Sequence, residues 1–371
     1  MAKKATRAEL IQEWVEADKS WIPINPNRHD TQQAVQPAYL ARGRGLIYRP
    51  DPSGRLEPWA DCAHVLGQGQ PVQFFQSGGH ILAQMLDIRS NARTRGPRDP
   101  LEEECTLTLL WDSEGTLPCP FPMEINGRCV YSAIAPQADG GLLVYIHGVC
   151  YNPSGSIRDL IRYAPSGEAV WKRDLGFATP LFCPGGIWMI SLLRSNGQDV
   201  GDFAWRDLDG EERAHFQLLE SCRRHVSLPE DSDDLWVFTE DQYPMCNLVR
   251  LNRETGEEAR VRLNNWVTSL HPVGDMVLRL GGGATLLERD TLQVRADLSS
   301  KQPSHFLGQD SRGRLWLENK GMVECYDLDL KEISRHRLKG SVMGSHLDGD
   351  GTLCVVTYQA KEELARVYRI F

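Results

Sequence analysis

The sequence predicts an all-β protein assembled from a repeated unit of four short strands. The clearest copy runs from Ser304 to Leu338, where four apolar segments alternate with turn-forming residues. Its second segment, Leu315 to Leu317, is apolar at consecutive positions, as expected of a strand that is covered on both faces. Four-stranded units repeated about every 35–45 residues are typical of β-propeller blades. We therefore expect a seven-bladed β-propeller, with six or eight blades as alternatives, and a short N-terminal helix.

The first turn and second strand of this unit recur along the chain. The copies are Ala138–Ile146, Cys183–Ser191, Glu230–Phe238, Val273–Leu280 and Asp348–Val356. A tryptophan occupies the same position of the second strand in three units, at Trp188, Trp236 and Trp316. We expect the side chains of Trp236 and Trp316 to fill space between packed sheets.

The outer two strands of the unit recur as hairpins. Seven of them follow in near-regular order, at Leu46–Trp59, Leu109–Phe121, Leu160–Leu175, Phe203–Leu218, Leu248–Leu263, Leu286–Leu298 and Met322–Leu338. Five of the turns contain a glycine, which adopts a positive φ at little cost: Gly54, Gly115, Gly167, Gly210 and Gly256. An irregular β-sandwich is the alternative, but the regular order of the hairpins favours a propeller.

Two segments resemble known propeller repeats. The segment DSRGRLWLENKGMVECYDLD, Asp310 to Asp329, looks like the repeats of NHL, two-component-regulator and gluconolactonase-type propellers. The segment YAPSGEAVWKRDLG, Tyr163 to Gly176, is similar to pyrroloquinoline-quinone-type repeats. As a pattern, the resemblance extends from about Gln36 onward. Enzymes, sensors and scaffolds share such repeats, so the resemblance implies a fold and no single activity. The metal cluster of the gluconolactonase-type enzymes has no residue-by-residue match in this sequence.

Composition limits the class of protein. The chain has 371 residues, of which 41% are hydrophobic and 25% are charged, as in an ordinary globular protein. The formal net charge of −9 argues against a nucleic-acid or anionic-membrane partner. No apolar segment reaches the roughly 18–20 residues that span a bilayer, and the charged N-terminus has no signal-peptide core. The ten cysteines form no C-x-x-C pair, which indicates reduced thiols, a cytoplasmic protein and no zinc site. We expect no cofactor.

The first 38 residues are expected to lie apart from the propeller, which would comprise residues 39–371. Thr6 to Glu9 matches a capping box, and the apolar residues from Leu10 to Val15 have helical spacing. We expect this amphipathic helix either to pack against the propeller or to provide a second contact for a partner. Trp21 to Ala38 contains three prolines and is predicted to be an extended connector.

Closure of the ring is predicted from two incomplete units. The last unit ends with Leu364 to Phe371 as its third strand, and the hairpin Leu46–Trp59 precedes any inner strands of its own. We expect this N-terminal hairpin to complete the last blade and so to leave no exposed sheet edge.

Four long segments between second and third strands predict a binding face. They are Asp87–Glu104, Gly148–Asp159, Arg194–Asp202 and Glu240–Cys246. Long loops on a rigid scaffold are common binding sites. The candidate contact residues in these loops are Arg89, Arg93, Arg95, Arg98, Tyr151 and Asn152. Three glutamates follow the arginines, so a solvated, self-compensating loop is the alternative.

Histidines near the predicted central channel form a second candidate site. His225 and His305 occupy equivalent positions at the start of innermost strands, and His271 and His346 lie nearby in their own units. Converging imidazoles could bind a metal or act as acid and base. The structural alternative is that each imidazole bonds the backbone of the next blade.

The sequence favours a binding protein over an enzyme. It has no G-x-S-x-G, no GxxxxGK[ST] and no H-E-x-x-H motif, so we assign no catalytic or metal-binding residue. The favoured function is a non-enzymatic scaffold or recognition protein that binds a protein partner through its long-loop face. The alternative is a metal-dependent hydrolase, lactonase or lyase with its site at the channel mouth.

Overall fold

The computed structural model describes most of the chain. The described residues are 6–15, 21–26, 38–41, 45–63, 70–77, 80–88, 104–112, 123–137, 139, 141–151, 154–183, 185–195, 198–227, 232–240, 245–264, 267, 269–298, 301, 303, 305–348 and 350–371. Within these ranges, no helix is long and apolar enough to cross a bilayer.

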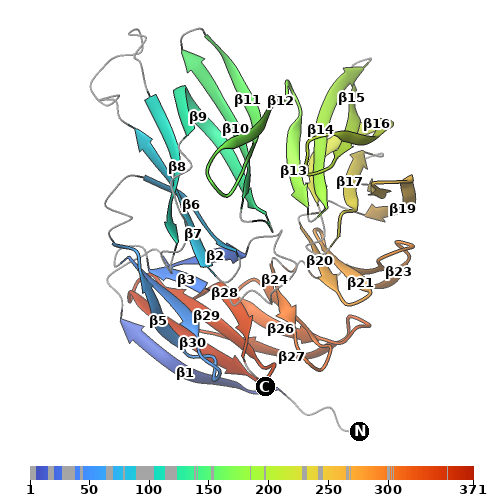
Figure 1. Ribbon diagram of the computed structural model, residues 1–371. Helices are drawn as coiled ribbons and strands as arrows, with labels where there is room; N and C mark the ends of the chain where they lie inside the picture. The colour runs from blue at the N-terminus through green and yellow to red at the C-terminus, as the bar shows by residue number, and fades with distance from the viewer. Residues whose placement is uncertain are drawn as a thin grey trace.

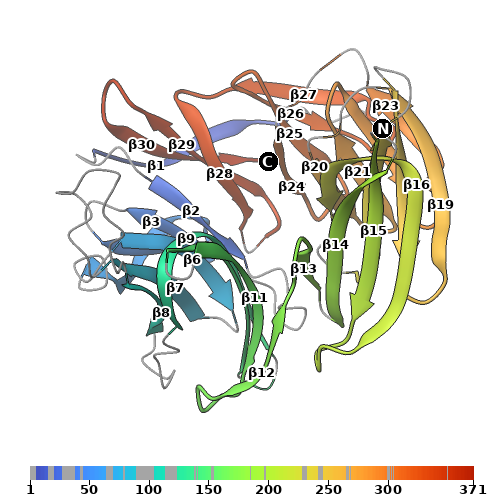
Figure 2. The same ribbon diagram turned by 90° about the horizontal axis from the view of Figure 1, so that it is seen from above.

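Hydrogen bonding groups the strands into eight antiparallel units, which we number as blades in chain order (Figures 1 and 2). Blade 1 contains β2 (Trp21–Pro26), β3 (Ala38–Ala41), β4 (Leu46–Pro50) and β5 (Leu56–Asp61). Blade 2 contains β6 (Gln70–Ser77), β7 (His80–Ile88), β8 (Glu104–Asp112) and the first part of β9 (Met123–Pro136). Blade 3 contains the rest of β9, β10 (Leu142–Tyr151), β11 (Ser154–Tyr163) and β12 (Ala169–Asp174). Blade 4 contains β13 (Thr179–Cys183), β14 (Gly186–Ser195), β15 (Gln198–Arg206) and the first part of β16 (Glu212–Ser227).

The second half of the ring follows the same order. Blade 5 contains the rest of β16, β17 (Leu235–Glu240), β18 (Met245–Asn252) and β19 (Gly256–Asn264). Blade 6 contains β20 (Ser269–Val273), β21 (Met276–Leu280), β22 (Ala284–Glu288) and β23 (Val294–Leu298). Blade 7 contains β24 (His305–Gln309), β25 (Leu315–Asn319), β26 (Met322–Tyr326) and β27 (Glu332–Arg337). Blade 8 contains β28 (Ser341–Leu347), β29 (Leu353–Gln359), β30 (Leu364–Ile370) and β1 (Ala8–Val15).

Two long strands each serve two blades. Residues Met123–Asn126 of β9 pair with β8, and Gly127–Pro136 pair with β10. Residues Glu212–Ser221 of β16 pair with β15, and Cys222–Ser227 pair with β17. Because of these shared strands and a parallel pairing of β2 with β6, two of the hydrogen-bonded sheets contain eleven and seven strands.

The predicted N-terminal helix is wrong, because this segment is the strand β1. It pairs antiparallel with β30, from Ala8 opposite Ile370 to Val15 opposite Leu364, with a bulge at Ile11. Pairing satisfies the backbone groups along the outer edge of β30, and Ile11 packs against the core between blades 8 and 1. Tertiary pairing thus outweighs the local helical pattern.

The predicted closing segment and the blade count are corrected together. β1 completes the last blade, whereas the hairpin β4–β5 pairs with β3. Trp21–Pro26, predicted as part of a connector, is β2 and provides the hairpin with an inner strand. The N-terminal region therefore forms a blade of its own, which gives eight blades, one of the alternatives to seven.

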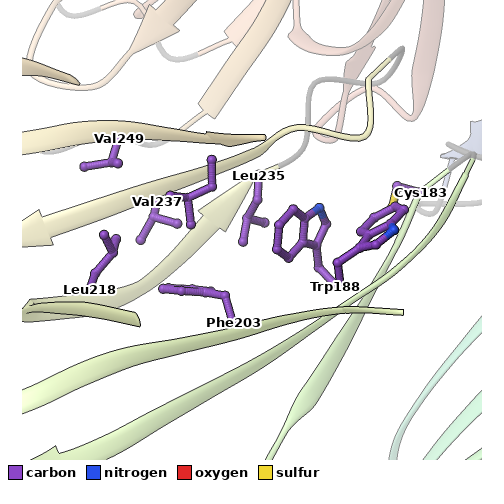
Figure 3. Close-up of a cluster of buried hydrophobic side chains, with 9 residues drawn as sticks. Cys183, Trp188, Phe203, Leu218, Leu235, Val237 and Val249 are labelled. Carbon is purple, nitrogen blue, oxygen red and sulfur yellow. The ribbon is translucent and has the colours of Figure 1, made fainter. Parts of the chain in front are cut away.

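Apolar side chains from neighbouring blades pack face to face around the ring. Leu235 and Val237 on β17 pack toward blade 4, while Trp236 between them packs toward blade 6. Figure 3 shows the cluster between blades 4 and 5, with Trp188 between Leu235 and Cys183. Trp236 and Trp316 are fully buried between two sheets, as predicted, and Trp188 is likewise fully buried between blades 4 and 5.

The interfaces close the ring. Apolar clusters of described residues lie between blades 3 and 4, 4 and 5, 5 and 6, 6 and 7, 7 and 8, and 8 and 1. Blades 1 and 2 are joined by the pairing of β2 with β6, and blades 2 and 3 share β9.

The alternating strand directions define two sides of the ring. The second and fourth strands of a blade run in the same direction and therefore end on the same side of the ring. The hairpins from second to third strands and the connections from one blade to the next both lie on this side, which we call the hairpin face. On it, β10 and β11 pair as far as Tyr151 opposite Ser154, and β14 and β15 as far as Ser195 opposite Gln198. These two predicted loops are therefore mostly long β-hairpins. In blade 7 the corresponding strands have only five residues each.

Candidate interaction face

The predicted contact residues are only partly within the described chain. Arg89, Arg93, Arg95, Arg98 and Asn152 lie outside the described residues. The backbone of Tyr151 ends β10 at the tip of its hairpin. The backbone of His225 belongs to the part of β16 that pairs with β17. His305 begins β24, and its side chain is described.

The described channel histidines make separate local contacts. The His305 side chain is 74% exposed, and its Nδ1 lies 3.1 Å from Oε2 of Glu318 in the same blade. His271 Nε2 lies 2.9 Å from the Ser269 hydroxyl, and its ring lies 5.0 Å from the ring of Phe306. The described ranges contain no group of three or more His, Cys, Asp or Glu side chains that could hold a metal ion.

His346 is buried between blades 8 and 1. Its Nε2 donates to the carbonyl of Gly54 over 3.2 Å, so in the neutral imidazole Nδ1 accepts from the Tyr39 hydroxyl, also over 3.2 Å. Burial lowers the pKa of His346 from 6.5 to about 4, against the opposing effects of the Gly54 carbonyl and of Asp51. His346 thus makes the bond to the next blade that the structural interpretation of these histidines predicts.

Acid is expected to weaken this contact. Because the pKa of His346 is lower in the folded chain, the unfolded chain binds a proton more readily between pH 6.5 and 4, and stability falls as the pH falls through that range. We expect the free energy of unfolding to drop by about 2–3 kcal/mol more in the native protein than in His346→Gln between pH 7 and 4.5. Denaturant unfolding of both proteins at several pH values measures this difference. Parallel pH profiles would contradict the assignment.

Three exposed apolar side chains lie on the hairpin face, one in the connection from blade 3 to blade 4 and two in blade 4. Phe177, in the connection from blade 3 to blade 4, is 86% exposed, and Leu219, on β16, is 80% exposed. They are the two most exposed large apolar side chains in the described part of the chain. Leu193, near the end of β14, is 46% exposed.

A tight turn holds Phe177 in solvent. The Ala178 N–H donates to the Leu175 carbonyl over 2.9 Å, and Gly176 between them has a φ of 56°. The Leu175 N–H donates to the Arg158 carbonyl over 2.7 Å, which fastens the turn to β11. The Arg158 guanidinium carbon lies 5.4 Å from the centre of the Phe177 ring, a cation–π distance.

A β-bulge positions Leu219. Val200 on β15 pairs with Leu193 on one side and with Ser221 on the other, whereas the next residue, Gly201, pairs with Leu218. The intervening residues of β16, Leu219 and Glu220, therefore form a bulge, which redirects side chains. Arg260 of blade 5 donates to Glu220 over 2.5 Å and holds the bulge in place.

Sequence reasoning missed these apolar residues. Phe177 follows the turn sequence Asp174-Leu175-Gly176, where solvent exposure is expected, so an aromatic residue there was an available signal. Leu219 follows Leu218 in a strand where residues alternate between faces, and the bulge that exposes it has no local marker.

Comparisons with known proteins support the fold. No protein-family model matches the chain, and no curated protein matches it in sequence. Among solved structures, BamB from Moraxella catarrhalis is similar at 13% identity and a TM-score of 0.51, over 98% of this chain and 97% of BamB. The Dos1 propeller is similar at 11% identity and a TM-score of 0.53, over 98% and 95%. A eukaryotic initiation factor is similar at 9% identity and a TM-score of 0.57, over 97% and 83%.

These likenesses establish the architecture alone. Together with the eight four-stranded units, they identify the chain as a β-propeller. The finer resemblance to NHL, gluconolactonase-type or pyrroloquinoline-quinone-type repeats stays a prediction from sequence. Since propellers support unrelated activities, function has to be argued from the hairpin face.

Proposed function

We propose that this protein is a non-enzymatic propeller that binds a protein partner through the hairpin face of blades 3 to 5. The observation that carries this proposal is the exposure of Phe177 and Leu219 on that face. Large apolar side chains that strands and turns hold in water are candidates for interaction sites. Aromatic residues are enriched in protein interfaces, and they anchor many of them.

The predicted contacts extend this proposed surface. The segment that contains the four arginines connects β7 to β8. Tyr151 ends β10, and Asn152 follows it in the connection to β11. His225 and His305 belong to first strands of their blades, and we infer that they lie near the same side of the ring. We assign to the surface Arg89, Arg93, Arg95, Arg98, Tyr151, Asn152, His225 and His305. β1 contributes to blade 8, so we do not propose it as a second contact.

We further propose that the protein works in a reducing compartment such as the cytoplasm. Four described cysteines are buried free thiols, at Cys62, Cys183, Cys325 and Cys354. Burial raises the pKa of Cys62 to about 11 and those of Cys325 and Cys354 to about 12. Protonated, buried thiols behave as small apolar groups, which is consistent with a structural role.

A charge-introducing variant tests the proposed face. Leu193→Glu combined with Leu219→Glu is expected to reduce recovery of the partner by about 30-fold, because about 2 kcal/mol is typical for loss of an interface anchor. Val294→Glu is the matched control, since Val294 is 51% exposed on the outer strand β23 of blade 6. The measurement is quantitative affinity purification of tagged full-length chains from the native extract, with melting temperatures as a check on folding.

A partner is identified by comparing its recovery with Val294→Glu and with the double variant Leu193→Glu, Leu219→Glu. A protein that the native chain and Val294→Glu recover equally, and that the double variant loses, supports the hairpin face. If Val294→Glu abolishes recovery while the double variant retains it, the working surface lies elsewhere.

A further inference from the structure

Three ring-containing side chains and one arginine form a continuous row on the side of blade 3 that faces blade 4. The Tyr145 and His147 rings are stacked 6.5 Å apart at an interplanar angle of 26°. His147 pairs across the strands with Arg158, whose guanidinium lies against Phe177. Tyr145 is buried, His147 and Arg158 are half-buried, and Phe177 is exposed, so the row leads from the core to the solvent.

The facing strand of blade 4 has a similar gradient of exposure. Ile187 and Met189 on β14 are buried in the cluster that contains Tyr145. Alternate residues share one face of a strand, so Ser191 and Leu193 continue this side toward the hairpin face. Ser191 is half-buried and Leu193 is exposed. The space between the two blades is therefore filled at the core and accessible to solvent near Phe177 and Leu193.

Arg158 provides the positive charge on the blade 3 side of this space. The ion pairs in the described part of blade 3 join Arg162 to Asp139, Lys172 to Asp159 and Arg173 to Glu211, and none of them engages Arg158. Burial lowers the pKa of His147, and the nearby charge of Arg158 lowers it further. A carboxylate placed here would gain a charge-assisted hydrogen bond from a guanidinium that is already positioned by its strand.

We propose that the space between blades 3 and 4 is a subsite for an acidic, apolar peptide segment of a protein partner. A carboxylate of the segment binds Arg158, and a neighbouring apolar side chain packs between Phe177 and Leu193. An arginine beside an aromatic ring is a frequent anchor of protein interfaces. The formal net charge of −9 disfavours a nucleic acid or an anionic membrane as the partner, because both attract positively charged proteins. The subsite rests on the proposed function, because it lies on the same face.

The test uses a displayed library of random 12-residue peptides selected against the immobilised full-length protein. We expect enriched peptides to contain Asp or Glu beside Leu, Phe or Trp. Their synthetic copies should lose affinity at least about tenfold for Arg158→Gln and for Phe177→Ser. Arg173→Gln is the matched control, because Arg173 is a partly exposed arginine of the same blade that pairs with Glu211.

A double-mutant cycle identifies the ion pair. Replacing the acidic residue of a peptide by its amide should weaken binding to the native protein as much as Arg158→Gln does, and should add little to that variant. The subsite would be overturned if the selected peptides were basic, or if their affinity were unchanged by Arg158→Gln and Phe177→Ser. It would also be overturned if the protein enriched no peptides beyond those that bind the bare support. If the subsite fails while Leu193→Glu with Leu219→Glu still abolishes partner recovery, the hairpin face stands. If both tests fail, the proposed function falls with the subsite.

Discussion

Deletion of residues 1–15 is expected to lower the free energy of unfolding by about 5 kcal/mol or more, because it removes β1 and opens the ring. Seven residue pairs join β1 to β30, and each backbone hydrogen bond contributes about 1 kcal/mol. The deletion also removes contacts between blades 8 and 1. The Gln12 side chain donates to the Leu56 carbonyl over 2.9 Å and accepts from the Leu56 N–H over 2.8 Å. The buried Arg366 would lose Glu13, which lies 2.7 Å away.

Denaturant unfolding of the truncated chain measures this effect. Deletion of residues 1–5 is the control, since it leaves the whole of β1, and it should unfold like the full chain. A synthetic peptide of residues 6–15 should restore part of the lost stability in a concentration-dependent way, because it binds only the folded ring. A truncated chain with native stability that ignores the peptide would refute closure by β1.

Trp316→Ala is expected to destabilise the protein by about 3–5 kcal/mol, because it leaves a cavity between blades 7 and 8. Trp316 is fully buried in the cluster that joins these blades. Its indole N–H donates to the Asp310 carboxylate over 3.0 Å. Asp310 also accepts from the Arg314 side chain and from two backbone N–H groups, so the carboxylate keeps partners in the variant. The main loss is therefore of packing.

Equilibrium unfolding in guanidinium chloride checks this prediction. Val294→Ala, at an exposed site on β23, should change stability by about 0.5 kcal/mol or less. Trp316→Phe should cost less than Trp316→Ala, because the phenyl ring refills part of the cavity. Near-neutral behaviour of Trp316→Ala would mean that β25 is not packed between two blades.

The repeating parts of the fold were predictable because their signals are local. Consecutive apolar residues at Leu315–Leu317 indicate a strand between two sheets, and all three are buried. Gly54, Gly167 and Gly210 have φ values of 83–84°, as the predicted turns require. Each signal depends on residues that are neighbours in sequence.

Ring closure was not predictable in detail because its partners are far apart in sequence. The pattern from Leu10 to Val15 satisfies helical spacing, and only the open edge of β30, some 350 residues later, decides for a strand. The three prolines between Trp21 and Ala38 likewise favour a connector, although Pro23 and Pro26 lie in β2. Pairing with β3 and β6 decides that case.

The sequence predicted that the long segments between second and third strands share one side of the ring, but it did not predict the exposed residues Phe177 and Leu219. Counting strands places the long segments after second strands, and β10–β11 and β14–β15 do extend on a common side. The exposure of Phe177 depends on the turn that binds Arg158, and that of Leu219 on a bulge opposite Val200. Such features come from backbone geometry, which residue types alone do not specify.

The shared strands β9 and β16 make two junctions of the ring intolerant of insertions and deletions. Side chains alternate along a strand, so one residue added near Ser221 would exchange the core-facing and outward-facing side chains of one of its two blades. The connection between blades 6 and 7 has no such constraint, because β23 and β24 are separate strands and a loop can absorb an added residue. Over evolutionary time, chain length is therefore expected to vary between blades 6 and 7, while β9 and β16 keep a fixed number of residues.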